Sequence, residues 1–127
     1  MKEITVCCAI MRNRELILIA RRSANMSMPL LWEFPGGKLE KGENPEDCLI
    51  REIQEELNVA IRINKFIGKF SHPYSEFIIH LLAFEVELIQ GILHASEHQE
   101  LRWVRVDELK NFTFTEADLP IVELICH

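Results

Sequence analysis

One segment near the middle of the chain, residues 36–59, constrains the fold more than any other, because it encodes a helix with both ends marked. Asn44 is a favourable N-cap residue, and Pro45 suits the first helical position, where its missing amide hydrogen is not needed. The helix is expected to end at Leu57, with Asn58 in the left-handed conformation that closes many helices. Its buried stripe is predicted to consist of Leu49, Ile50, Ile53 and Leu57.

Four glutamates gather in this segment: Glu43, Glu52, Glu55 and Glu56. The last three lie within four positions of one another, so they share one face of the helix. Like charges at this spacing destabilise a helix, and Arg51 is the one cation beside them. A hard divalent cation such as Mg²⁺ prefers carboxylate and carbonyl oxygens and also takes phosphate oxygens as ligands. The pattern therefore indicates a metal-assisted enzyme that acts on phosphates.

Strand-forming runs flank the helix on both sides, at residues 4–11, 16–20, 32–34, 60–70, 77–89 and 101–106. Arg12-Asn13-Arg14 predicts a hairpin between the first two runs, whereas residues 21–31 show no period and predict a loop. Pro35-Gly36-Gly37 and Gln90-Gly91 predict turns. A short helix over residues 121–125 is expected to begin around Pro120. Strands with one central and one final helix favour an α+β protein or a mixed sheet between helices.

Composition limits the classes of partner. The 127 residues, 48% of them hydrophobic, are enough for one domain, residues 1–127, with its own core. A net charge of −6 argues against a non-specific grip on long nucleic acid. The apolar run 77–84 is too short to span a membrane, and the N-terminus has no signal pattern. The four cysteines have no zinc-type spacing, which favours buried thiols in a reducing, cytoplasmic location.

The central segment resembles the Nudix box, Gly-x5-Glu-x7-Arg-Glu-U-x-Glu-Glu-x-Gly-U, in which U is an aliphatic residue. Gly37 opens the match and Val59 closes it, and the one departure is Asn58 in place of the late glycine. Both residue types tolerate the left-handed conformation, so we expect the departure to leave activity intact.

The resemblance continues outside the box. Ala20-Arg21-Arg22, residues 32–38 and residues 117–120 are similar to the MutT branch of the family, which includes enzymes of the 8-oxo-dGTPase and CTP pyrophosphohydrolase kinds. The resemblance therefore implies the Nudix α/β/α sandwich, a mixed sheet between helices that carries the box as loop–helix–loop.

The resemblance also implies roles for individual residues. The metal ligands would be the Gly36 carbonyl and the carboxylates of Glu52, Glu55, Glu56 and Glu97, and Glu43 would either join them near the metal or brace the loop. Mg²⁺ is the expected ion, with Mn²⁺ as a substitute. Arg51 would hold the carboxylates in place, and Lys38 and Arg22 would meet phosphate. The metal would activate a water whose proton passes to a carboxylate, with Glu52 as the first choice and Glu97 as the second. The expected catalytic residues are therefore Arg51, Glu52, Glu55, Glu56 and Glu97.

Base recognition is implied for Arg22, Phe34 and Asp118. The 8-oxo-dGTP branch has an asparagine at the last position, and an ionised aspartate there can only accept hydrogen bonds. Asp118 would suit an exocyclic amino group, such as that of cytosine or guanine. It could equally interact with the N-terminus of the final helix, where the dipole favours a carboxylate. No histidine is assigned a chemical role, because none has paired metal-ligand spacing.

The function expected from this resemblance is hydrolysis of a nucleoside triphosphate to a monophosphate and pyrophosphate, to clear oxidised or non-standard nucleotides. Two alternatives remain open. One keeps the chemistry and changes the substrate to a dinucleoside polyphosphate, a nucleotide sugar or capped RNA. The other is a non-catalytic Nudix module that senses a nucleotide. The expected partner is a small nucleotide, and the sequence leaves open a monomer or a homodimer.

Overall fold

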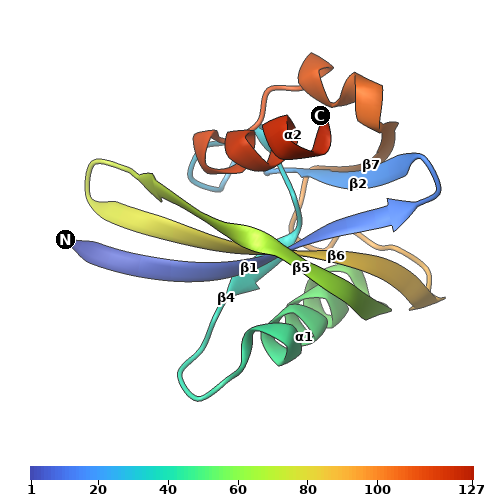
Figure 1. The fold of residues 1–127 in the computed structure, drawn as a ribbon, viewed down its shortest axis with the longest axis horizontal. Helices are drawn as coiled ribbons and strands as arrows, with labels where there is room; N and C mark the ends of the chain where they lie inside the picture. Colours follow the sequence, from blue (N-terminus) through green and yellow to red (C-terminus); the bar gives the residue numbers. More distant parts are fainter.

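The computed structural model describes residues 1–127 and shows a seven-stranded mixed sheet with helices on both of its faces (Figure 1). The strands are β1 (Lys2–Asn13), β2 (Leu16–Arg21), β3 (Trp32–Glu33), β4 (Gly36–Lys38), β5 (Val59–Pro73), β6 (Phe77–Gly91) and β7 (Glu100–Arg105). The helices are α1 (Pro45–Leu57) and α2 (Leu119–Ile125), with two 3₁₀ turns, η1 (Val106–Asn111) and η2 (Glu116–Asp118), before α2. The predicted α/β/α arrangement is confirmed.

The long strand β1 organises the sheet. It pairs in parallel with β6 and antiparallel with β2 and β4, while β5 pairs with β6 and β7 pairs with β2. Successive side chains of a strand point to opposite faces, and both faces of β1 are covered. Cys7, Ala9 and Met11 therefore pack with α1, whereas Cys8 and Ile10 pack with the α2 side. The α1 and α2 layers enclose one core on each face of the sheet.

The central helix begins and ends where the sequence predicts. The Asn44 side chain accepts a hydrogen bond from the amide of Asp47 at 2.9 Å, and Asn58 has φ 61° and ψ 33°. The predicted stripe is wrong at one position: Ile50 is 41% exposed, and Cys48 is buried in its place. Helix positions advance by about 100°, so Cys48 and Ile50 lie on opposite flanks of Leu49. The Cys48 flank packs against β1 and β4, and Ile50 therefore faces outward.

Two predicted turns are part of strands instead. The Gly36-Gly37 pair belongs to β4, whose Gly37 lies opposite Cys7 of β1. A Cβ on Gly36 would lie 1.9 Å from the Cys7 carbonyl oxygen, so glycine is needed here for the approach of two backbones. Gln90-Gly91 ends β6 and does not form a tight hairpin, although Gly91 has a φ of 104°.

The hairpin at Arg12-Asn13-Arg14 and the loop before Trp32 are confirmed, and the final helix begins one residue before the predicted Pro120. Neither helix combines the length and apolar character that crossing a bilayer requires.

Candidate active site

The acidic face of α1 is organised by one arginine. Arg51 donates two hydrogen bonds to Glu43, from Nε at 2.7 Å and from Nη2 at 3.0 Å. Its Nη1 donates to Glu52 at 2.9 Å and to Glu55 at 3.3 Å. A two-point contact between a guanidinium and a carboxylate fixes the orientation of both groups. Arg51 therefore joins the loop before the helix to the helix itself.

This contact changes the ionisation of Glu43. The hydrogen bonds from Arg51 lower the pKa of Glu43 to about 2, against the opposing effect of desolvation. Glu43 is therefore ionised at any physiological pH. Its two oxygens are both engaged by Arg51. In this arrangement Glu43 braces the loop, which is one of the two placements that the sequence left open for it.

The side chain of Glu52 packs against Gly37 in strand β4. A Cβ added to Gly37 would lie 2.1 Å from Glu52 Oε2, closer than any real side-chain contact. The side chain of Glu52 is only 14% exposed, whereas that of Glu55 is 59% exposed. The three helix glutamates therefore differ: Glu55 faces solvent, Glu52 packs under Gly37, and Glu56 lines a cleft.

Glu56 carries an unsatisfied buried oxygen. Its Oε2 is shielded from solvent and has no hydrogen-bond partner. Burial, with the charges of Glu52, Glu97 and Glu33, raises the pKa of Glu56 to about 8. A buried carboxylate oxygen without a partner is unfavourable, and a cation is the partner that would satisfy it.

These acidic residues fit a divalent cation, although they are not already gathered around one point. No group of three or more His, Cys, Asp or Glu side chains is arranged as a ready ligand set. Oxygen ligands are what Mg²⁺ and Mn²⁺ prefer, and the Glu52 carboxylate is close enough to contribute to the raised pKa of Glu56. The fit therefore rests on the chemistry of the donors and on the unpartnered Glu56 oxygen.

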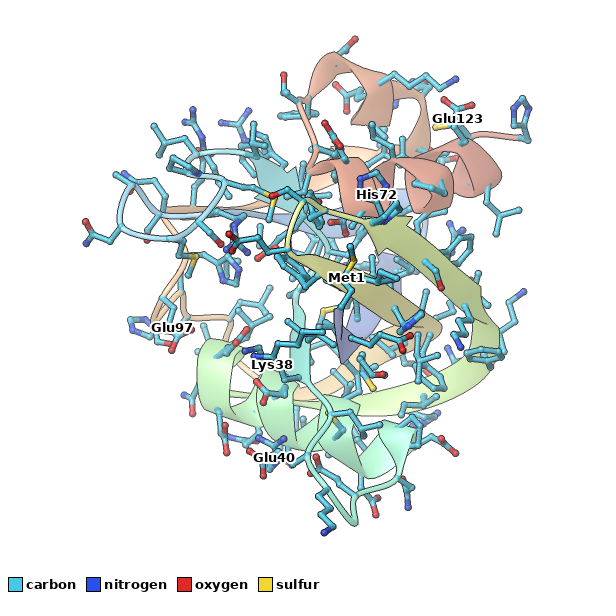
Figure 2. All side chains as sticks on the ribbon, turned by 90° about the vertical axis from the view of Figure 1, so that its left-hand side faces the viewer. Met1, Lys38, Glu40, His72, Glu97 and Glu123 are labelled. Atoms are coloured by element: carbon cyan, nitrogen blue, oxygen red, sulfur yellow. The ribbon has the colours of Figure 1, made fainter.

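A cleft of about 400 Å³ connects this acidic end to the other predicted residues. Seven of the predicted site residues line it: Arg22, Phe34, Gly36, Lys38, Glu56, Glu97 and Asp118. Figure 2 shows Lys38 and Glu97 on the same side of the molecule, next to α1. Glu43, in the loop before α1, does not line the cleft, and neither do Arg51, Glu52 and Glu55 of α1.

Glu97 reaches the cleft on a loop that is fixed to the end of α1. Ser96 donates from its hydroxyl to the Glu56 carbonyl at 2.8 Å, and the His94 amide donates to the Leu57 carbonyl at 3.0 Å. The last carbonyls of a helix lack partners within the helix, so these bonds satisfy them. The loop therefore has a defined position beside Glu56, while the Glu97 side chain itself is exposed.

Asp118 is a buried residue in the lining of the cleft. It is 5% exposed, and its carboxylate accepts hydrogen bonds from the Phe34 amide at 3.2 Å and from the Thr115 hydroxyl. Burial raises its pKa to about 7, partly offset by those bonds. It makes no side-chain cap to α2, so its contacts favour the cleft over the helix terminus.

The sequence did not reveal a buried network beside Arg22. Glu33 accepts a hydrogen bond from Arg22 Nη1 at 2.7 Å and another from His98 Nε2 at 2.9 Å. All three residues line the cleft. The partners of Glu33 lie 11 and 65 positions away, so no local spacing marks them. The single available signal was the alternation of β3, which turns Glu33 to the face opposite Trp32.

Comparison with known proteins agrees with the fold and the box. The NUDIX domain model matches residues 1–125, so the chain belongs to the Nudix family of hydrolases. It is 37% identical to the CTP pyrophosphohydrolase of Escherichia coli (strain K12), over 97% of this chain and 91% of that protein. It is 32% identical to the 8-oxo-dGTP diphosphatase of the same strain, over 96% and 95% of the two chains.

Solved structures give the same result. The solution structure of the E. coli ORF135 protein superposes with a TM-score of 0.86 at 37% identity, covering 97% of this chain and 88% of that one. A DNA mismatch repair protein MutT from methicillin-resistant Staphylococcus aureus 252 gives a TM-score of 0.80 at 38% identity, covering 99% and 98%.

Proposed function

We propose that this chain hydrolyses nucleoside triphosphates to nucleoside monophosphates and pyrophosphate, with Mg²⁺ as the cofactor and Mn²⁺ as a substitute. The observation that carries the proposal is the buried, unpartnered oxygen of Glu56, which lines the same cleft as Lys38 and Asp118. One cleft thus offers carboxylates for a metal, a cation for phosphate and a polar group for a base. The relatives named as CTP pyrophosphohydrolase and 8-oxo-dGTP diphosphatase support this substrate class.

The proposed metal ligands are Glu52, Glu55, Glu56 and the Gly36 carbonyl, with Glu97 approaching from its loop. A bound divalent cation supplies charge neutralisation at the phosphates and acidity toward water. Glu43 and Arg51 hold the helix carboxylates in position, because Arg51 contacts both Glu43 and Glu52.

Proton removal from the attacking water is assigned to a carboxylate, either Glu52 or Glu97. Glu52 is held by Arg51 and packs against Gly37, so its position is fixed before substrate arrives. Glu97 is exposed on a loop bound to α1 and has more freedom. Kinetics of the two glutamine variants would distinguish them: loss of the base reduces kcat much more than KM. No covalent intermediate is required, so the cysteines take no part.

Base selection is assigned to the end of the cleft that contains Phe34 and Asp118. Each Asp118 oxygen accepts one hydrogen bond already and has a further lone pair to offer. An acceptor here matches the exocyclic amino group of cytosine or guanine. Arg22 is assigned to the phosphates or the base, although three of its hydrogen bonds are made within the protein. We place the enzyme in a reducing cytoplasm, because its four cysteines are free.

A pyrophosphate-release assay over a panel of substrates tests the proposal. The panel contains CTP, dCTP, oxidised purine nucleotides, a dinucleoside polyphosphate, a nucleotide sugar and capped RNA, each with Mg²⁺. We expect release from triphosphates, and we expect Glu56→Gln to remove most of it. Glu46→Gln is the matched control, because Glu46 is an exposed glutamate in the first turn of the same helix.

Other outcomes would select the alternatives. Turnover only of capped or dinucleoside substrates would favour the second enzyme class. Binding without turnover of any substrate would favour a sensor. Full activity of the Glu56→Gln variant would contradict the proposed metal site.

A further inference from the structure

Arg22, Glu33 and His98 form a hydrogen-bonded network that lines the cleft, and two of its members, Glu33 and His98, have no role in the proposed chemistry. Glu33 occupies the middle, and its two oxygens accept one hydrogen bond each, from Arg22 at 2.7 Å and from His98 at 2.9 Å. The side chain of His98 is only 2% exposed and that of Glu33 is 19% exposed. Because both oxygens are engaged, the orientation of Glu33 depends on both partners.

On one side, the network fixes the loop at residues 23–31. Arg22 donates from Nε to the Ser27 carbonyl at 2.7 Å and from Nη2 to the Ser27 hydroxyl at 3.1 Å. Met28 and Leu30 have φ values of 48° and 63°, which residues with a Cβ adopt only when their surroundings enforce it. Met28 lines the cleft. Arg22 is therefore a main constraint on this wall of the cleft.

On the other side, His98 belongs to the loop that carries Glu97. The next residue, Gln99, donates its amide hydrogen to the Arg21 carbonyl at 2.8 Å, so the loop joins β2 at this point. A carboxylate only accepts hydrogen bonds, which places the imidazole hydrogen of His98 on Nε2. Nδ1 is buried and has no partner, so the contact with Glu33 is the one hydrogen bond that its ring makes.

We propose that His98 is a positioning residue for nucleotide binding. Its bond to Glu33 fixes Glu33, Glu33 fixes Arg22, and Arg22 holds the 23–31 loop against the cleft. The inference rests on the proposed function, because it concerns affinity for the nucleotide. The hydrogen bonds of the network run to the wall of the cleft, and none of them reaches a carboxylate of α1 or that of Glu97, so loss of the network should change KM more than kcat.

Two substitutions of His98 separate the hydrogen bond from the shape of the ring. His98→Phe keeps a planar ring and removes the donor, whereas His98→Gln retains an N–H near the position of Nε2. We expect His98→Phe to raise KM about tenfold, the loss typical of one hydrogen bond to a charged group, and to change kcat by less than about twofold. His98→Gln should restore most of the affinity. An unchanged KM in His98→Phe, or a fall in kcat alone, would overturn the inference.

A double-mutant cycle tests the path of the effect. In a Glu33→Gln background, His98→Phe should have little further effect on KM, because the pair already lacks its charged acceptor. Additive effects of the two substitutions would show that His98 acts by another path and would overturn the inference.

A measurement without turnover keeps this inference separate from the proposed function. Nitrogen-15 NMR of the imidazole in substrate-free protein should show the hydrogen of His98 on Nε2, and Glu33→Gln should alter that signal. A hydrogen on Nδ1 would overturn the inference even in an active enzyme. A wild-type protein that hydrolyses no nucleotide would instead contradict the proposed function. If His98→Phe shows no cooperative melting transition, and is therefore not folded, the KM of His98→Gln and the NMR signal of the wild-type imidazole test the inference instead.

Discussion

Replacing Asp118 by asparagine should change how the stability of the protein depends on pH. Burial raises the pKa of Asp118 from 3.8 to about 7, so the folded protein keeps a proton that the unfolded chain releases near pH 4. A group with a raised carboxyl pKa stabilises the fold at low pH, and this contribution is lost as pH rises through the folded pKa. Asparagine is close in shape to aspartate and does not titrate.

The size of the effect follows from the two pKa values. A change of about three pKa units at about 1.4 kcal/mol each corresponds to about 4 kcal/mol between pH 4 and pH 8. The free energy of unfolding of Asp118→Asn, minus that of the wild type, should therefore increase by about 4 kcal/mol from pH 4 to pH 8. The hydrogen bond from the Phe34 amide can be kept, because an amide oxygen also accepts.

Urea unfolding at several pH values, followed by the fluorescence of Trp32 and Trp103, measures this difference. Asp107→Asn serves as the control, because Asp107 is an exposed aspartate whose side chain is 64% accessible. The control should show no comparable pH dependence. A stability difference between Asp118→Asn and the wild type that stays flat from pH 4 to pH 8 would refute the assignment of a protonated, buried Asp118.

Three further predictions concern the acidic helix. Glu56→Gln should raise the melting temperature of the metal-free protein at pH 8. The pKa of Glu56 is raised from 4.5 to about 8, so its ionisation destabilises the folded protein as pH rises through this range. Added Mg²⁺ should raise the melting temperature of the wild type only, as measured by differential scanning fluorimetry. Gly37→Ala should reduce kcat/KM about a hundredfold, because its Cβ would displace Glu52. Gly68→Ala, whose Cβ would meet only the Phe70 ring at 3.4 Å, is the control and should keep the activity. Arg51→Met should lower the melting temperature at pH 7, because Glu43 loses its paired cation. The difference in melting temperature from the wild type should become smaller as pH falls from about 4.5 toward 2, where Glu43 loses its charge in both proteins. A difference that stays constant over this range would contradict the role of Arg51.

Local signals in the sequence predicted the central helix and the residues of the acidic site. The N-cap, the proline after it and the left-handed Asn58 each act within a few residues, so the bounds of α1 were correct. The error at Ile50 arose because Cys48 and Ile50 flank Leu49 on opposite sides, and only packing with β1 decides which of the two faces the core.

Contacts between distant segments were beyond the reach of local patterns. Gly36 and Gly37 form a strand because β1 passes close enough to pair with them, and a turn signal cannot report that partner. The pairing of Glu33 with His98 across 65 positions is likewise a product of the folded sheet. Glu97 was predicted beside the acidic helix through a family resemblance, and its loop does dock on the end of α1.

Anomalous diffraction from a crystal grown with Mn²⁺ and a non-hydrolysable nucleoside triphosphate tests the account most directly. We predict a manganese peak bound by Glu52 and Glu56, with the triphosphate next to it and the base near Asp118. A fully occupied nucleotide in the cleft without any anomalous peak at these carboxylates would contradict the account.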